Sequence, residues 1–175
     1  MTVALIAAIA ENNAIGLEGK LLYHLPQDMR RFRLITTGNT VLMGRNTYRS
    51  LPKGALPNRL NVVLSRTGRA QDFPGCLHFT NLPDALKHLQ DLAPSDPRAR
   101  QLYVIGGAQL YTQTLPLADR LLLTRVHDTP SRADAFFPAI DPDDWTETLR
   151  EPHSADEKHS HPYTFIDLVR VSKAF

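Results

Sequence analysis

The chain has 175 residues, 42% of them hydrophobic and 22% charged, which is enough for one domain with a substantial core. Its formal net charge of +2 is too small to favour nucleic acid or an anionic membrane as a partner. The single cysteine, Cys76, excludes an intramolecular disulfide and has no activating neighbour, so we expect an inert thiol and a cytoplasmic protein.

The first expected element is a strand over residues 3–9. A continuous apolar run of this length is typical of a strand that is covered on both faces. It is too short to span a bilayer, and no Lys or Arg precedes it, so we expect neither a membrane span nor a signal peptide. Residues 12–20 contain two glycines and are expected to form a mobile loop.

The rest of the chain alternates between strands and helices as far as residue 119. After it, strand-like segments follow one another with no helix between them, which is typical of antiparallel strands that complete a parallel sheet. Expected helices cover 26–36, a short segment from 45, 83–92 and 108–115. Expected strands cover 40–43, 60–64, 75–79, 102–105, 120–126, 146–149 and 163–171, and expected loops 93–97, 141–144 and 151–161. This order predicts one α/β domain over residues 1–175, a mixed, mainly parallel sheet with helices on both faces.

Three of the expected strands end in residue types that suit phosphate. Glycines allow the backbone to approach an anion, helix N-termini attract one, and guanidinium groups bind one. Together they predict a nucleotide-like ligand at the carboxyl edge of the sheet, although neither the GxGxxG nor the P-loop fingerprint is present. The residues are Gly106-Gly107, Gly44-Arg45 and Ser65-Arg66.

The expected helix over residues 26–36 has one acidic side chain, Asp28, within its apolar stripe. The stripe comprises Leu25, Met29, Phe32 and Thr36, and the side chains expected to point away are Gln27, Arg30 and Arg31. A carboxylate in such a stripe must be paired, hydrogen bonded or functional, because burying a lone charge is costly. An acid in the first turn is also favoured by the helix macrodipole. The residues alone leave both interpretations open.

Two further patterns are expected to have no metal-binding role. His159 and His161 have a metal-like spacing but no acidic or cysteine partner in a helical register, so we predict a solvated loop rather than a zinc site. Residues 141–144 are expected to form a turn, because Pro142 and Trp145 break the pattern of a calcium loop.

Seven short motifs follow one another along the chain: Ile15-Gly16, Leu25-Pro26-x-Asp28-x-x-x-Phe32, Met43-Gly44-Arg45-x-Thr47, Leu56-Pro57-x-Arg59, Leu64-Ser65-Arg66, Ile105-Gly106-Gly107 and Thr124. In this order the set resembles the dihydrofolate reductase family, with similarity from residue 3 to about residue 169. The resemblance implies an eight-stranded sheet with four helices. It also implies NADPH-dependent reduction of dihydrofolate to tetrahydrofolate, for one-carbon metabolism and thymidylate synthesis. Antifolate inhibitors would be further ligands, and a monomer is expected.

On the substrate side, the resemblance makes Asp28 the sole ionisable group of the pterin pocket, paired with N3 and the 2-amino group. Thr124 would share this hydrogen-bond network. Arg59 would bind the α-carboxylate of the glutamate tail, for which a guanidinium is well suited. Further substrate contacts would come from Ile6, Ala8, Met29, Phe32, Leu51, Ile105 and Tyr111.

On the cofactor side, the resemblance implies that Ala8 and Ile15 contact the nicotinamide and that residues 12–20 close over it as a lid. Arg66 would bind the 2′-phosphate of NADPH. Arg45, Thr47 and Ser65 would hold the other phosphates, and Gly106 and Gly107, joined by a cis peptide, would contact the dinucleotide. Further contacts would come from Gly16, Leu21, Gly44, Asn46, Leu64, Ile105, Ala108, Gln109 and Leu110.

The expected chemistry centres on Asp28. Hydride transfer belongs to the cofactor, while the carboxylate would orient the pterin and raise the basicity of N5, with water as the final proton donor. Burial should raise the pKa of Asp28. The sequence departs from the family at Tyr23, which replaces a tryptophan and whose phenol would help to hold a water near the pterin carbonyl, and at Leu22, which replaces a proline.

Three other interpretations compete with this one. A pyrimidine reductase of riboflavin synthesis would share the phosphate features but has no reason to have Leu-Pro-x-Asp with a buried acid. A non-catalytic nucleotide- or pterin-binding module would not need a lid. A structural protein would have an incidental acid at the start of a helix.

Overall fold

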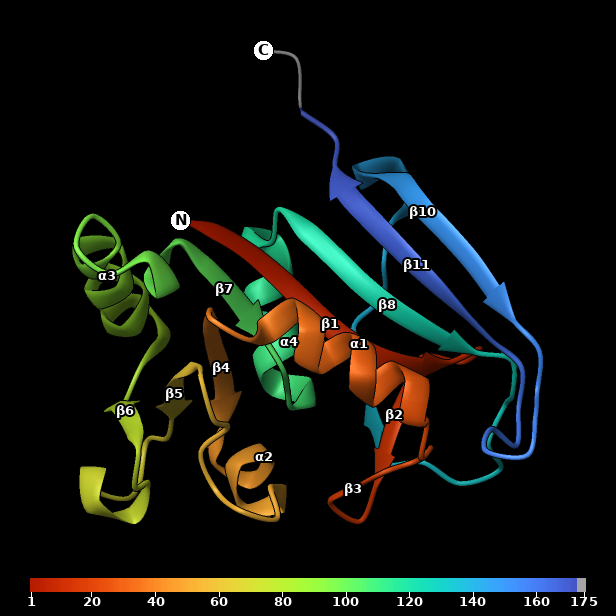
Figure 1. The fold of residues 1–175 in the computed structure, drawn as a ribbon, viewed down its shortest axis with the longest axis horizontal. Coiled ribbons are helices and arrows are strands. Elements are labelled where there is room, and N and C mark those ends of the chain that lie inside the picture. The colour runs from red at the N-terminus through yellow and green to blue at the C-terminus, as the bar shows by residue number, and fades with distance from the viewer. Residues whose placement is uncertain (173–175) are drawn as a thin grey trace.

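An eight-stranded, mainly parallel sheet forms the centre of the computed structural model, which describes residues 1–172 (Figure 1). The last three positions of the expected domain over 1–175 lie outside the described residues. From one edge to the other the strands are β10 (Trp145–His153), β11 (Tyr163–Arg170), β8 (Arg120–Val126), β1 (Thr2–Ala10), β7 (Gln101–Val104), β4 (Thr40–Gly44), β5 (Leu60–Leu64) and β6 (Cys76–Phe79). Only the pairings of β11 with β8 and with β10 are antiparallel in this sheet. The mixed, mainly parallel sheet expected from the sequence is confirmed.

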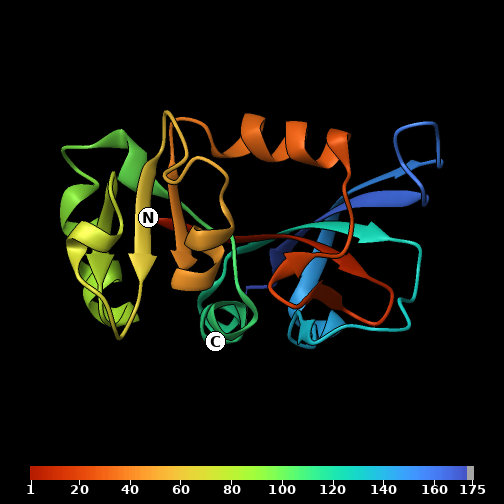
Figure 2. The same ribbon diagram turned by 90° about the horizontal axis from the view of Figure 1, so that it is seen from below.

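Helices cover both faces of this sheet, as expected, with α1 (Pro26–Thr36) and α4 (Ala108–Thr114) on opposite sides (Figure 2). Alternate residues of β1 face the two sides: Ala4 and Ile6 pack in the same cluster as side chains of α1 and α2 (Arg45–Ser50). Leu5 and Ile9 pack in a second cluster with α3 (Leu82–Leu92) and α4. Burial on both faces explains why β1 is a continuous apolar run. No helix within residues 1–172 is long and apolar enough to cross a membrane.

The segment expected to be a loop over residues 12–20 is instead part of a small sheet. Its strands are β3 (Lys20–Leu21), β2 (Ala14–Leu17) and β9 (Ala135–Phe136). Glu18 and Gly19, with φ of 51° and 76°, form the tight turn between β2 and β3. A Cβ on Gly16 would lie 3.1 Å from the Lys20 carbonyl oxygen, so the hairpin closes against bare backbone there. The glycines that indicated a loop are those that the hairpin requires.

Two other segments depart from expectation. Strand β10 extends to His153, although residues 151–153 were expected in a loop. A register shift between Glu147 and Leu149 disrupts the alternation of inward and outward side chains by which a strand is predicted from sequence. The expected loop around residue 97 contains a 3-10 helix. The 3-10 helices are η1 (Ala70–Asp72), η2 (Pro97–Arg100), η3 (Leu115–Leu117) and η4 (Pro142–Asp144).

Candidate active site

The carboxyl group of Asp28 lies in the first turn of α1, where the helix crosses the neighbouring strands β8 and β11. The helix begins at Pro26, a position that tolerates proline because its N–H would have no partner inside the helix. On β8, the Thr124 hydroxyl donates a hydrogen bond to Oδ1 of Asp28. Asp28 is therefore partnered, and its other oxygen is left for a ligand.

The electrostatic environment of Asp28 favours its neutral form. Burial raises the pKa of this carboxyl above its ordinary value, and the Thr124 hydrogen bond and the charge of Arg31 oppose that increase without cancelling it. A carboxyl group of this kind, held against apolar side chains, can bind a polar ring edge and take part in proton chemistry.

Apolar side chains from the sheet, from α1 and from the ends of α2 and β7 pack in one cluster on the α1 side of the sheet. The cluster brings together four of the expected substrate contacts, namely Ile6, Phe32, Leu51 and Ile105. Ala8 is the register partner of Thr124, which places it on the adjacent strand. From α4, the buried Tyr111 hydroxyl donates a 2.7 Å hydrogen bond to the carbonyl of Ile6. Met29 does not join the cluster, because its side chain is 55% exposed.

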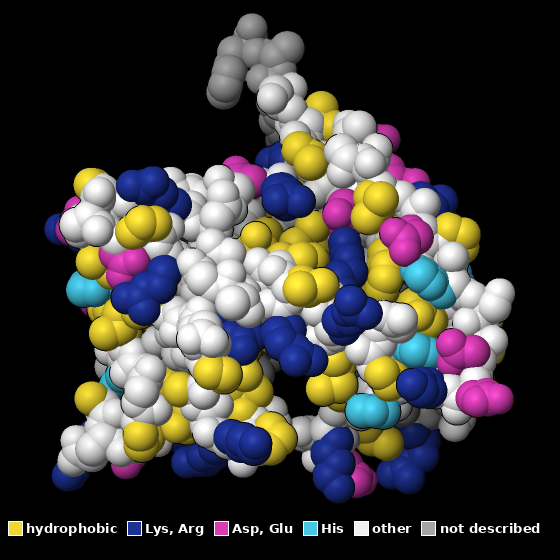
Figure 3. Space-filling view, in the orientation of Figure 1, with side chains coloured by type: hydrophobic (Ala, Val, Ile, Leu, Met, Phe, Trp, Pro, Cys, Tyr) yellow, Lys and Arg dark blue, Asp and Glu magenta, His cyan; other side chains and the backbone are white. Residues whose placement is uncertain are grey.

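Arg59 lies at the opposite end of α1 from Asp28. Its Nη1 donates to the Thr36 hydroxyl at 3.1 Å and its Nε to the Pro57 carbonyl at 2.8 Å. Burial, and then the charge of Arg33, lower the pKa of Arg59, which is a cation without an acidic partner in those contacts. At 1.5 Å per residue, Asp28 and Thr36 are separated by about 12 Å along the helix. The face is hollowed below α1, between the region of α2 and the β2–β3 hairpin, and Lys and Arg side chains gather over α1 (Figure 3).

The carboxyl ends of β4 and β7 meet at two glycines. The Gly44 N–H donates to the Gly106 carbonyl at 2.9 Å, and the peptide bond between Gly106 and Gly107 is cis. Gly106 has a φ of 122°, and a Cβ there would lie 3.4 Å from the Thr47 hydroxyl and 3.5 Å from the Tyr111 ring. Backbone free of side chains is therefore kept beside the Thr47 hydroxyl, an arrangement that suits a phosphate group.

The ends of β4 and β5 lie side by side, because Gly44 is the register partner of Leu64. Arg45 donates from Nη1 to the Thr67 hydroxyl at 2.6 Å, and Ser65 donates to the Thr67 carbonyl. Thr67, which our sequence reasoning missed, therefore joins the two strand ends. The only sequence signal for it was its place in the turn that follows β5.

The other expected cofactor contacts fall on neighbouring elements. Those that begin helices are Asn46 and Thr47 on α2 and Ala108, Gln109 and Leu110 on α4. Arg66 is exposed and follows Ser65, just beyond the end of β5. Ile15 and Gly16 lie on β2, while Leu21 on β3 is the register partner of Gly16 and is 82% exposed.

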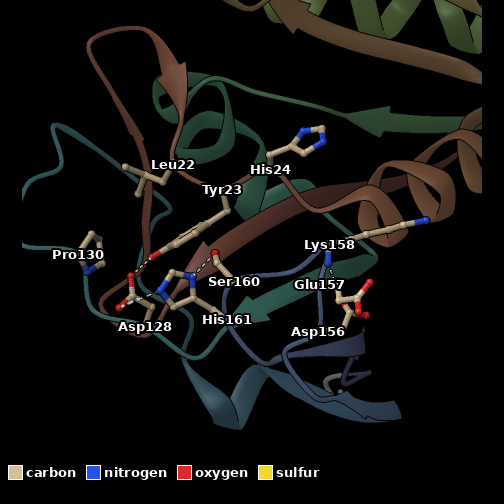
Figure 4. A pocket seen from close by; sticks show the side chains of 10 residues that line it. All are labelled: Leu22, Tyr23, His24, Asp128, Pro130, Asp156, Glu157, Lys158, Ser160 and His161. Carbon is tan, nitrogen blue, oxygen red and sulfur yellow. Dashed lines mark hydrogen bonds and ion pairs between the residues drawn. The ribbon is translucent and has the colours of Figure 1, made fainter.

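Tyr23 is hydrogen bonded to Asp128, a residue that the sequence analysis did not name. Its hydroxyl donates a 2.7 Å hydrogen bond to Asp128 Oδ2, and its ring meets His161 edge-on at 5.5 Å (Figure 4). Burial, followed by the hydrogen bond and the charge of Asp128, raises the pKa of Tyr23. These residues line a groove of about 530 Å³, together with Leu22, His24 and Pro130. The Tyr23 hydroxyl therefore donates its proton to a hydrogen bond with Asp128 in this structure.

His159 is not solvated, contrary to our expectation. It is 2% exposed, its Nδ1 lies 2.8 Å from Asp156 Oδ1, and its Nε2 accepts a 3.2 Å hydrogen bond from the Gln27 N–H of α1. Among residues 1–172, no group of His, Cys, Asp and Glu side chains could hold a metal ion. Cys76 is half-buried, and burial raises the pKa of its thiol to about 11, which disfavours the reactive thiolate.

Comparison with known proteins gives a consistent result. The sequence model of the family described as dihydrofolate reductase matches residues 2–170. The chain is 40% identical over 170 residues to dihydrofolate reductase type 3 of Salmonella typhimurium, covering 97% of this chain and 99% of the relative. It is 37% identical over 164 residues to dihydrofolate reductase of Bacillus subtilis (strain 168), covering 94% and 92%. Dihydrofolate reductase from Enterococcus faecalis complexed with NADP(H) and RAB-propyl is a similar structure, with a TM-score of 0.82, 31% identity, and coverage of 97% and 96%.

Proposed function

The chain belongs to the dihydrofolate reductase family, and from that premise we propose that it reduces 7,8-dihydrofolate to 5,6,7,8-tetrahydrofolate, with hydride delivered to C6 and a proton to N5. The enzyme is an NADPH-dependent oxidoreductase. The observation that carries the proposal is the partnered carboxyl of Asp28 beside an apolar cluster, at one end of a helix whose other end positions a guanidinium.

The two ends of α1 match the two ends of the substrate. The Asp28 carboxyl pairs with N3 and the 2-amino group of the pterin, with Thr124 in the same network. Arg59 binds the α-carboxylate of the glutamate tail. The separation of about 12 Å along the helix supports this assignment, because a pterin and a glutamate carboxylate are joined by an extended linker of comparable size.

The strand ends described above fit a dinucleotide. Gly106 and Gly107 bring bare backbone against it, Thr47, Arg45 and Ser65 lie where phosphates can be held, and Arg66 takes the 2′-phosphate. When bound, NADPH supplies the hydride. The chain's own residues hold the two ligands, exclude water with apolar side chains and orient the pterin ring.

The proton at N5 comes from water. Asp28 orients the pterin and raises the basicity of N5 from the far side of the ring system. Burial raises the pKa of Asp28 above its ordinary value, which supports a role for this carboxyl in proton chemistry. Antifolate inhibitors bind in the same pocket. The single domain over 1–175, the monomeric state and the cytoplasmic location remain predictions from the sequence.

Replacing Asp28→Asn tests the proposed function, because the change keeps the shape and removes the charge. We expect hydride transfer in a single turnover to fall steeply at neutral and higher pH, where free dihydrofolate is least protonated at N5, and to recover as the pH is lowered. In the unmodified enzyme the rate should fall as pH rises through one apparent pKa that belongs to carboxylate and substrate together. Stopped-flow measurement separates this step from product release. Near-normal hydride transfer by the variant at pH 8 would contradict the proposal.

A further inference from the structure

Strand β11 places an aromatic ring and a carboxylate beneath α1. Phe165 is the register partner of Thr124, so the two side chains lie on one face of the sheet, and Asp167, two residues further along β11, lies on the same face. Arg31 of α1 reaches this face. Its Nη2 lies 2.5 Å from Asp167 Oδ1, and its guanidinium carbon lies 4.7 Å from the centre of the Phe165 ring.

This ion pair is largely shielded from solvent. The side chains of Arg31 and Asp167 are 16% and 15% exposed, so their attraction is screened less than that of a surface pair. The sequence did not indicate the pair, since Arg31 was expected to point away from the apolar stripe. The position of β11 beneath the helix draws the long side chain inward instead.

Arg31 has a second potential partner on its own helix. Asp28 precedes it by three residues, a spacing that puts the two Cβ atoms about 5–6 Å apart and allows an acid and a guanidinium to pair. In the structure, however, Asp28 accepts from Thr124, and Arg31 is bound to Asp167. Two carboxylates thus compete for one guanidinium, and the structure shows the pairing that leaves Asp28 without a direct ion pair.

We propose that Asp167 is a positioning residue of the active site, which holds Arg31 against β11 and thereby prevents its guanidinium from pairing with Asp28. This inference rests on the proposed role of Asp28 as the group that binds the pterin. A direct pair between Arg31 and Asp28 would occupy the carboxylate oxygen that the pterin needs. Asp167 keeps that oxygen available while Arg31 stays near enough to act on Asp28 through its charge.

The other titratable groups around Asp28 are two phenols and an imidazole. Tyr111 from α4 and Tyr163 from β11 have pKa values raised by burial first, with the charge of Asp28 as a further cause, so both stay neutral near pH 7. His159, from the loop between β10 and β11, contacts the adjacent Gln27 N–H. Among the charged groups that act on Asp28 itself, Arg31 is the cation.

The proposal makes opposite predictions for the two members of the pair. The test follows the titration of Asp28 in the full chain labelled with carboxyl-13C aspartate, with the Asp28→Asn variant to assign its signal. In Asp167→Asn the freed Arg31 pairs with Asp28, and the Asp28 midpoint should fall by about one pH unit. In Arg31→Gln the cation is lost and the midpoint should rise. The double variant should follow Arg31→Gln.

Two control variants isolate the effect. Asp167→Glu keeps a carboxylate for Arg31 and should restore the original midpoint. Asp96→Asn removes an exposed aspartate–arginine pair, with Arg98 at 2.7 Å, and should leave the Asp28 signal unmoved. A purely structural ion pair predicts that both single variants lose stability in a thermal melt without moving Asp28 in opposite directions.

An unchanged or raised Asp28 midpoint in Asp167→Asn would overturn the proposal. Should that variant fail to fold, a midpoint that does not rise in Arg31→Gln overturns it equally. A matching readout is the KM for dihydrofolate, which should increase about tenfold in Asp167→Asn and largely recover in the double variant. Because the titration is measured without substrate, it still reports on the pair if Asp28→Asn retains hydride transfer, so failure of the proposed function and failure of this inference are distinguishable.

Discussion

At the scale of single residues, the two guanidinium groups at the ends of β4 and β5, where we propose that phosphates bind, differ in their surroundings. Arg45 is hydrogen bonded to Thr67, whereas Arg66, just beyond the end of β5, is exposed. None of the hydrogen bonds or ion pairs found within residues 1–172 involves the Arg66 side chain, so it is available to a ligand. We therefore propose that Arg66, and not Arg45, discriminates between the two nicotinamide cofactors.

The Arg66→Ala variant tests this assignment. It should weaken NADPH binding by about tenfold to a hundredfold and leave NADH binding nearly unchanged, because only NADPH has the 2′-phosphate whose charge loses its partner. Cofactor titration by fluorescence gives both dissociation constants. Arg69→Ala, at another exposed arginine of the same turn region, is the matched control. Equal weakening of both cofactors would contradict the assignment.

The residue scale also shows where sequence reasoning ends. The residues alone left Asp28 open between a helix-start acid and a functional group, and the family resemblance suggested Thr124 as its partner. The structure places these two side chains in contact. Asp167 and His159 were missed as partners of α1 because their contacts join positions far apart in the chain, and no local spacing encodes such contacts.

At the scale of elements, α1 lacks a side-chain cap of its own. Leu25 occupies the N-cap position and makes no capping hydrogen bond. The partly buried N–H of Gln27 is instead satisfied by His159, from the loop between β10 and β11. The imidazole performs the task usually given to a Ser or Asp at the N-cap. It can do so only with an unprotonated Nε2, since that nitrogen is the acceptor.

Removing this cap should affect α1 more than the sheet. The His159→Leu variant, which fills similar space without an acceptor, should lower the free energy of unfolding by about 1–2 kcal/mol, the range for losing an N-cap or leaving a buried donor unpaired. Hydrogen exchange should show the first turn of α1 opening before the sheet. His24→Leu, at an exposed position, is the control and should have little effect. Equal loss from both variants would show that His159 is not a cap.

The elements themselves were largely predictable. Long periodic segments such as α1 and the apolar β1 are specified by local pattern, and the structure places both within a residue of expectation. The hairpin of β2 and β3 was wrongly expected to be a loop, because its strands are short and are stabilised by pairing with the distant β9. Strand β10 was cut short for a similar reason, since its irregular register hides its alternation.

At the scale of the whole molecule, the site is maintained at a cost to the fold. The pKa of Asp28 lies above its ordinary value of 3.8, so the folded protein binds a proton more tightly there than the unfolded chain does. Stability therefore decreases as pH rises through the interval between the two pKa values, and above it the buried charge destabilises the folded state by a constant amount.

The Asp28→Asn variant should consequently be more stable than the unmodified enzyme at pH 7, with a Tm higher by a few degrees, since about 1 kcal/mol shifts Tm by 2–4 °C in a domain of this size. The gain should vanish near pH 3, where the carboxyl is protonated in both states. Calorimetry at several pH values measures it. Asp96→Asn should behave oppositely, because Arg98 lowers the pKa of Asp96 and its charge favours folding. If the Tm difference between the variant and the unmodified enzyme were no larger at pH 7 than at pH 3, the charge of Asp28 would not destabilise the fold.

The place of β1 in the middle of the sheet has a consequence for folding during synthesis. β1 ends at Ala10, yet its two neighbours do not begin until Gln101 and Arg120. On a ribosome that adds 5–20 residues per second, the most apolar strand therefore waits on the order of ten seconds without a partner. Throughout that interval β1 lacks the two strands with which it pairs, and the closure of such distant pairings is intrinsically slow. We therefore expect a nascent chain of this topology to bind a chaperone until its second half emerges.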